Sequence, residues 1–167
     1  MKLASSKLNS HRGFALVEIL VAIAAVGIVV LSIVQITQLF LRVARLSSQR
    51  VEAIFLLQEG AEGIRFLRDT SWHDHIDTMT TGTPYYLLFT SGTYSVTANE
   101  PALVNGVFQR TITLFDVFRD DTTDDIVQTD GVLSTSTKRI EINVSWKTGA
   151  VTTTENMELF LGDIFQN

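Results

Sequence analysis

Hydrophobic residues dominate one continuous stretch near the start of the chain. Within residues 14–34 only Glu18, Gly27 and Ser32 fall outside the apolar set. A helix rises about 1.5 Å per residue and a bilayer core is about 30 Å thick, so this stretch is long enough to span a membrane. A secretory signal would have a shorter apolar region and a small-x-small cleavage site after it. Residues 35–42 contain no such site, so we expect the segment to be retained as an anchor.

The helical pattern continues beyond this stretch. Apolar residues recur at steps of three or four from Leu39 to Leu67, with one break at Arg50, and no proline occurs before Pro84. The spacing therefore predicts one helix from about Phe14 to about Arg68. Its apolar stripe consists of Leu39, Val43, Leu46, Ala53, Leu57, Ala61, Ile64 and Leu67.

Other positions of the same helix carry local signals. Glu62 with Arg65, and Arg65 with Asp69, are spaced to form ion pairs on the opposite face. Gly60 and Gly63 weaken a helix by up to about 1 kcal/mol each relative to alanine. They also permit close packing. A glycine at position 13 disfavours continuing the helix toward the N-terminus.

The composition changes near residue 70. One threonine, Thr37, precedes this point, and nineteen follow from Thr70 onward. Since threonine favours strands and turns, we expect a boundary here between a helical stalk and a β-rich head. Strands are predicted at residues 85–89, 93–97, 107–118, 138–147 and 151–161, with a turn at Thr148-Gly149.

The last three predicted strands indicate an antiparallel meander. Apolar and polar residues alternate along residues 138–147, so one face of the sheet is buried and the other is wet. The only long amphipathic surface available to cover the buried face is the helical stripe from Leu57 to Leu67. The predicted fold class is therefore α+β, with a long N-terminal helix and a C-terminal antiparallel sheet packed on its second half.

Charge and composition exclude several classes of function. The 167 residues carry a net charge of −5 and no cysteine, which excludes disulfides, thiolate chemistry and cysteine-ligated metals. From residue 70 onward five basic and thirteen acidic residues give −8, which disfavours nucleic-acid binding. No catalytic constellation or phosphate-binding glycine loop occurs. We expect no enzymatic activity and no cofactor.

The start of the apolar stretch carries the most informative motif. Residues 12–21 read Arg-Gly-Phe-Ala-Leu-Val-Glu-Ile-Leu-Val after a basic leader that contains no acid. This resembles the N-terminus of type IV prepilins and type II secretion pseudopilins. The resemblance implies a pilin-like fold, cleavage between Gly13 and Phe14 by prepilin peptidase, N-methylation of Phe14, and an assembly role for Glu18.

Glu18 is also unusual on physical grounds. A carboxylate inside a bilayer costs a few kcal/mol unless it finds a partner. Glu18 lies about one helical turn from the amine that cleavage would create at Phe14. In the family's filaments the partner is the amine of the neighbouring subunit. The simpler alternatives are a glutamate that snorkels to water and, for the whole N-terminus, an ordinary signal anchor.

A second, looser resemblance lies in residues 51–65. The stretch Gln58-Glu59-Gly60 and its surroundings are similar to minor, PilV-like or pseudopilin I-like pilins, in which a Phe-x-Arg and a Val-x-Trp strand motif also recur. The matching residues here are Phe108-Gln109-Arg110 and Val144-Ser145-Trp146. This resemblance favours a minor rather than a major pilin.

Together the resemblances imply a structural subunit of a type IV pilus or related filament. The implied divisions are a leader at 1–13, a membrane and assembly helix at 14–34, a stalk at 35–69 and a head at 70–167. Implied partners are other pilins, prepilin peptidase, the membrane and an inner-membrane assembly platform, with the leader cytoplasmic and the head outside. The alternatives are a pseudopilin of a type II secretion or DNA-uptake system and a monomeric, single-pass surface protein whose head binds a partner.

Two polar clusters are candidate metal sites. The loop at residues 119–131 holds five aspartates that could bind calcium, although it lacks the EF-hand order. They are Asp120, Asp121, Asp124, Asp125 and Asp130. Zinc could use His73 and His75 with a carboxylate, but no second cluster supports it. A solvated hairpin loop and a polar loop that caps the helix exit, with Trp72 folded back over it, are the simpler interpretations.

Overall fold

The computed structural model describes residues 11–164, with side chains from Phe14 onward. Residues 1–10 of the predicted leader lie outside this range. The helix α1 runs from His11 to Thr70 without interruption. It begins three residues earlier than predicted and includes Gly13, so the expectation that this glycine would end the helix is wrong. The predicted exit at residues 69–71 is confirmed.

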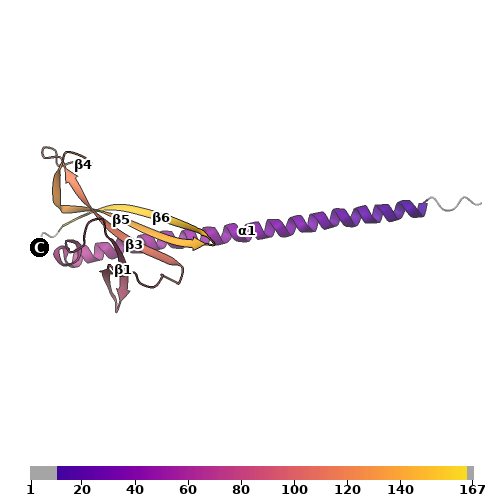
Figure 1. Ribbon diagram of the computed structural model, residues 1–167, viewed down its shortest axis with the longest axis horizontal. Helices are drawn as coiled ribbons and strands as arrows, with labels where there is room; N and C mark the ends of the chain where they lie inside the picture. The colour runs from indigo at the N-terminus through magenta and orange to yellow at the C-terminus, as the bar shows by residue number, and fades with distance from the viewer. Residues whose placement is uncertain (1–10, 165–167) are drawn as a thin grey trace, which may run out of the picture. The chain divides into compact units, whose positions relative to one another are not determined.

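The chain divides into two compact units, residues 1–48 and residues 49–167. The first unit contains the apolar part of α1. Up to residue 164, the second contains the remainder of α1, a short π-helical turn η1 (Trp72–Ile76) and six strands. The strands are β1 (Pro84–Thr90), β2 (Thr93–Thr97), β3 (Phe108–Arg119), β4 (Ile126–Val127), β5 (Val132–Thr148) and β6 (Val151–Gly162) (Figure 1).

All strand pairs in the second unit are antiparallel. The strand order is β2-β1-β3-β5-β6, and β4 pairs with the end of β3. The predicted meander is confirmed as β3, β5 and β6, with Gly149 at φ +64° in the turn between the last two. The sheet is larger than predicted, because β1 joins β3 through Pro84↔Thr113 and Tyr85↔Ile112. The predicted α+β fold is confirmed.

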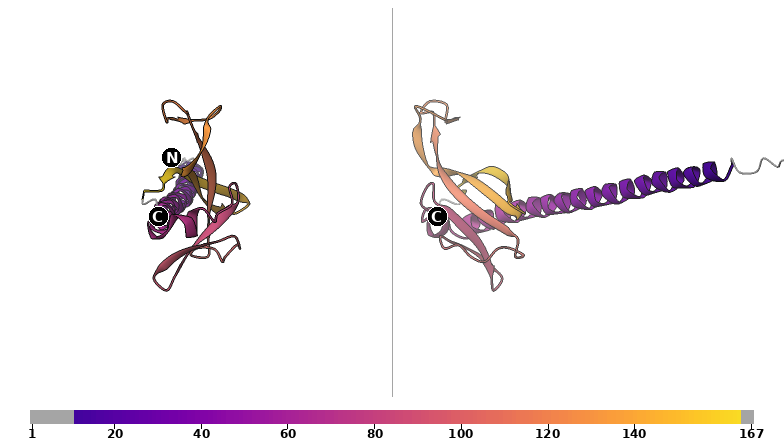
Figure 2. Two further views of the ribbon diagram at one scale, coloured as in Figure 1. Left: turned by 90° about the vertical axis from the view of Figure 1, so that its left-hand side faces the viewer. Right: turned by 45° about the vertical axis from the view of Figure 1, so that its right-hand side comes forward.

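The sheet packs against residues 53–67 of α1, as the stripe predicts. Ala53, Leu57, Ala61, Ile64 and Leu67 are all buried in one cluster with the inner face of the sheet. Figure 2 shows the sheet on one side of this part of the helix, with the β1–β2 hairpin and the β4 end reaching past it in opposite directions. Burial of these side chains is the main stabilising contribution to this unit.

Two glycines bring the helix and the sheet close together. A Cβ at Gly60 would lie 3.1 Å from Ile142 Cγ2, and a Cβ at Gly63 would overlap Leu87 Cδ2. The interpretation that these glycines serve close packing is confirmed. The helix propensity lost at these positions is offset by the contact that they allow.

A buried arginine joins the sheet to the helix. Arg110 of β3 points inward, donates to the carbonyl oxygen of Leu56 over 3.1 Å, and lies 3.1 Å from Oε2 of Glu59. The guanidinium therefore satisfies an acceptor and a carboxylate of α1.

The predicted ion pairs on the outer face of the helix differ in outcome. Arg65 lies 2.6 Å from Oε1 of Glu62, as predicted. The expected pair between Arg65 and Asp69 is wrong, because Asp69 instead pairs with its neighbour Arg68 over 2.7 Å. At the end of α1 the adjacent arginine reaches the carboxylate directly.

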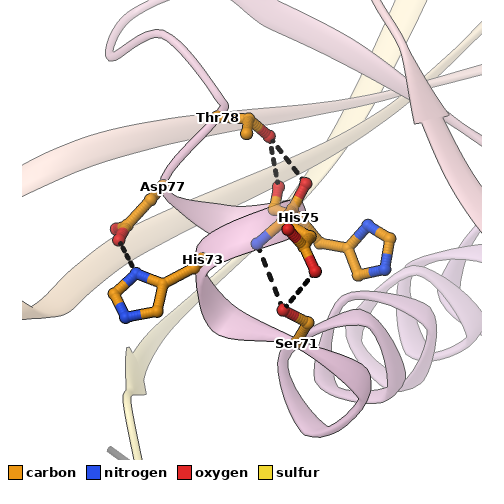
Figure 3. A network of polar contacts seen from close by, with 6 residues as sticks. Ser71, His73, His75, Asp77 and Thr78 are labelled. Carbon is orange, nitrogen blue, oxygen red and sulfur yellow. Dashed lines mark hydrogen bonds and ion pairs between the residues drawn. The ribbon is translucent and has the colours of Figure 1, made fainter. Parts of the chain in front are cut away.

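The helix exit folds into the π-helical turn η1 rather than an irregular loop (Figure 3). Ser71 caps it: its hydroxyl accepts from the backbone N–H of Asp74 and contacts the Asp74 carboxylate at 2.8 Å. Trp72 and Ile76 turn into the core, which confirms the predicted fold-back of Trp72. The polar turn is thus held to the core by two apolar side chains four positions apart.

Candidate functional site

The candidate site is the first half of α1, where cleavage and assembly are predicted. Every side chain from Phe14 to Ser48 is exposed, including Phe14 at 75% and Phe40 at 70%. α1 is the one helix within the described residues long and apolar enough to cross a membrane, and no residue of its most apolar window is buried. An uncovered apolar surface of this length is stable only against lipid or other apolar helices.

The polar side chains within this surface differ in whether they have a hydrogen-bond partner. Ser32 donates to the carbonyl oxygen of Ile28 over 2.8 Å, and Thr37 donates to that of Ile33 over 2.9 Å. These bonds satisfy the hydroxyl hydrogens inside the helix, so both residues are tolerated in an apolar environment. Their signal in the sequence is a small hydroxyl residue in or next to an apolar run.

Glu18 has no comparable bond among the described residues. It lies four residues after Phe14 on the same helix, so the two positions are one turn apart. No other acidic residue occurs in residues 1–48. The carboxylate is therefore available to a cation, and the nearest position where one could be created is the N-terminus at Phe14.

The predicted cleavage point lies inside α1. Gly13 and Phe14 are both helical. After cleavage between them, the processed helix would begin at what is now the second turn of α1. Glu18 would then lie near the helix N-terminus, where free backbone N–H groups favour a negative charge.

Comparison with known proteins agrees with this location. Residues 8–34 match the family model described as the prokaryotic N-terminal methylation motif. The match supports a type IV prepilin or pseudopilin family, whose members are structural, and a membrane-anchored precursor. Pilins and pseudopilins share this motif, so the match applies equally to both. No curated protein and no solved structure matches the chain.

The aspartate-rich segment forms a turn followed by the short strand β4. Asp120 Oδ1 accepts from the backbone N–H groups of Thr122 at 2.8 Å and Thr123 at 2.9 Å. These two bonds lower the pKa of the Asp120 carboxyl below its ordinary value of 3.8, and the bond from Thr123 has the larger effect. Asp124 lies 3.6 Å from Arg119.

Neither candidate metal cluster is assembled in the described part of the chain. No group of three or more histidine or acidic side chains there is placed to hold a metal ion. His73 Nδ1 lies 2.8 Å from Oδ2 of Asp77, while the rings of His73 and His75 lie on opposite sides of the turn (Figure 3). Calcium binding by the aspartates stays a prediction, which thermal melting with and without millimolar calcium tests.

Proposed function

We propose that this chain is a minor pilin subunit of a type IV pilus or a related filament. The observation that carries the proposal is the coincidence of the methylation motif at residues 8–34 with a helix exposed from Phe14 to Ser48. A motif of this kind marks a precursor, and the exposed apolar surface suits two successive environments. Lipid solvates it first, and helices of neighbouring subunits cover it in the filament. The stripe through Leu39, Val43 and Leu46 would be buried there.

On this proposal the chain is processed before it is assembled. Prepilin peptidase cuts between Gly13 and Phe14, residues 1–13 are lost, and Phe14 is N-methylated. Residues 14–34 then remain in the membrane, residues 35–69 form the stalk and residues 70–167 form the head. The leader faces the cytoplasm and the head lies outside it, and an inner-membrane assembly platform moves the subunit into the filament.

Glu18 has a specific role in this scheme. A lone carboxylate in the bilayer is costly, and pairing it with the Phe14 amine of a neighbouring subunit removes that cost. Because the pair forms only at one axial offset between subunits, it would set the register of the filament. The lack of a partner for Glu18 among the side chains described from Phe14 onward supports this role.

The minor subtype is supported by where its looser motifs meet. Glu59 of α1 pairs with Arg110 of the Phe-x-Arg motif, and a Cβ added at Gly60 would lie 3.3 Å from Arg110 Cδ. Arg110 pairs in register with Val144 of the Val-x-Trp motif, and the rings of Phe108 and Trp146 lie 5.7 Å apart. The three motifs thus lie together at one contact between helix and sheet, as expected if they maintain the fold that minor pilins share.

The assembly role is tested with Glu18→Gln and Glu18→Ala. Both variants should be processed and inserted as wild type, while their amount in sheared filaments falls about tenfold or more, because the inter-subunit charge pair is lost. Ser32→Ala is the matched control, since it removes a polar group of the same helix that already has a partner. Filament levels of the Glu18 variants equal to wild type would contradict the role.

A pseudopilin of a type II secretion or DNA-uptake system is the alternative, because the same motif serves both classes. Deleting the gene separates them. Loss of surface filaments with normal export of secreted proteins and normal DNA uptake supports a pilus subunit, and the reverse result supports a pseudopilin.

A further inference from the structure

We propose that Arg42 and Arg45 bind the phosphate groups of anionic lipids at the membrane surface on the side of the head, before the subunit is assembled. This interaction would fix the depth of α1 in the bilayer. The inference rests on the proposed membrane-anchored precursor. It concerns a binding surface that neither cleavage nor the Glu18 pair requires.

The first argument is that neither arginine has an acidic partner among the residues that the structure describes. The only acidic residue in residues 1–48 is Glu18, twenty-four positions before Arg42, which is about 36 Å along a helix. In residues 49–167, by contrast, every arginine lies within 4.0 Å of a carboxylate. These pairs are Arg50–Glu155, Arg65–Glu62, Arg68–Asp69, Arg110–Glu59, Arg119–Asp124 and Arg139–Glu158.

The second argument is the position of the two arginines along the helix. Arg42 lies 28 residues after Phe14, a rise of about 42 Å, and Arg45 lies at about 46 Å. A bilayer with its headgroups is about 40–45 Å thick. When Phe14 lies in the headgroups of one leaflet, Arg42 and Arg45 therefore lie in those of the other.

The third argument is the geometry and chemistry of the pair. Arg42 and Arg45 are three residues apart, so their side chains lie on neighbouring positions of one helix face, and both are exposed. A guanidinium group presents a planar fork of N–H donors that matches a phosphate with two parallel hydrogen bonds. Anionic lipids such as phosphatidylglycerol add net negative charge to that acceptor geometry.

The test measures lipid composition next to the two arginines. The chain has no cysteine, so Ser47→Cys provides a single site for a fluorescent label in the full chain. The labelled protein is placed in vesicles of phosphatidylglycerol and phosphatidylcholine in which one lipid at a time carries a headgroup quencher. Stronger quenching by phosphatidylglycerol is expected, and Arg42→Gln with Arg45→Gln should reduce this preference about twenty-five-fold, about fivefold per arginine.

Two control variants sharpen the result. Arg65→Gln with Arg139→Gln removes the same charge from paired arginines outside the first unit and should leave the preference unchanged. Arg42→Lys with Arg45→Lys keeps the charge and should retain most of the preference for phosphatidylglycerol. An unchanged preference in the variant Arg42→Gln with Arg45→Gln overturns the proposal. If the same variant also lowers the amount of filament in cells, the two arginines contact a neighbouring subunit rather than lipid.

The outcomes also separate this inference from the proposed function. Wild-type protein that fails to enter bilayers counts against the membrane-anchored precursor itself. Wild-type protein that inserts normally but shows no preference for phosphatidylglycerol counts against lipid binding alone.

Discussion

Individual residues of α1 decide how closely the helix approaches the sheet. Gly60 and Gly63 leave no side chain at the contact, and Arg110 fills the adjacent space with a guanidinium that reaches back to the helix backbone. Gly27 lies in the same helix, but a Cβ added there would meet no atom within 4 Å beyond the neighbouring helix backbone. The glycines of one helix thus differ in their effect on packing, because Gly60 and Gly63 face the sheet and Gly27 does not.

Gly63→Ala should destabilise the second unit. The new methyl group would overlap Leu87, which is buried and cannot move freely, so we expect a loss of about 1–3 kcal/mol that outweighs the better helix propensity of alanine. Chemical denaturation of the full chain in detergent, followed by the fluorescence of the buried Trp72 and Trp146, measures it. Gly27→Ala is the control and should show no loss. Equal stability of both variants would contradict the packing argument.

Among the elements, those with regular periodicity were predictable from the sequence. The stripe from Leu57 to Leu67 predicts the end of α1 to within two residues, and the alternation in β6 predicts that strand to within one residue. The first six residues of β5, from Val132 to Thr137, were missed because serine and threonine there carry no apolar alternation. The pairing of β1 with β3 was missed because it is a contact distant in sequence, which local pattern does not encode.

The candidate site was predictable to a different degree. Gly13, Phe14 and Glu18 form a linear motif, so sequence alone defines them. The burial of Arg110 was not among the predictions, because a charged residue in a strand normally faces water, although strand alternation places it on the buried face with Phe108 and Ile112. The contrast between Arg42 and Arg45 and the paired arginines of residues 49–167 likewise depends on the folded structure, because several of those pairs join residues distant in sequence.

The turn before β4 should respond to acid through Asp120. Its pKa is lowered in the folded chain by the N–H groups of Thr123 and Thr122, so this contribution to stability is present above the ordinary value of 3.8 and is lost as the pH falls through the lower folded value. NMR titration should show the chemical shifts of the Asp120 carboxyl and the two threonine amides changing together at a pH below 3.8. In Asp120→Asn this shared transition should vanish. A carboxyl midpoint at or above 3.8 would contradict the bonding.

At the scale of the whole molecule, charge and hydrophobicity are segregated along the chain. Residues 1–13, the proposed leader, hold three basic and no acidic residues, while residues from 70 onward carry −8. Between them lies an apolar helix whose side chains are exposed from Phe14 to Ser48. This arrangement suits a precursor that loses its leader, stays in the membrane through one helix and later exchanges lipid for neighbouring subunits.

Processing at Phe14 is the central claim, and intact-mass spectrometry of the protein extracted from membranes tests it most directly. Cells with an active prepilin peptidase should yield a chain that lacks residues 1–13 and carries one methyl group on Phe14. Gly13→Val should accumulate the uncut chain, because the added side chain obstructs the cleavage point. An unmethylated chain that still begins at Met1 in those wild-type cells would contradict the account and favour a plain membrane anchor.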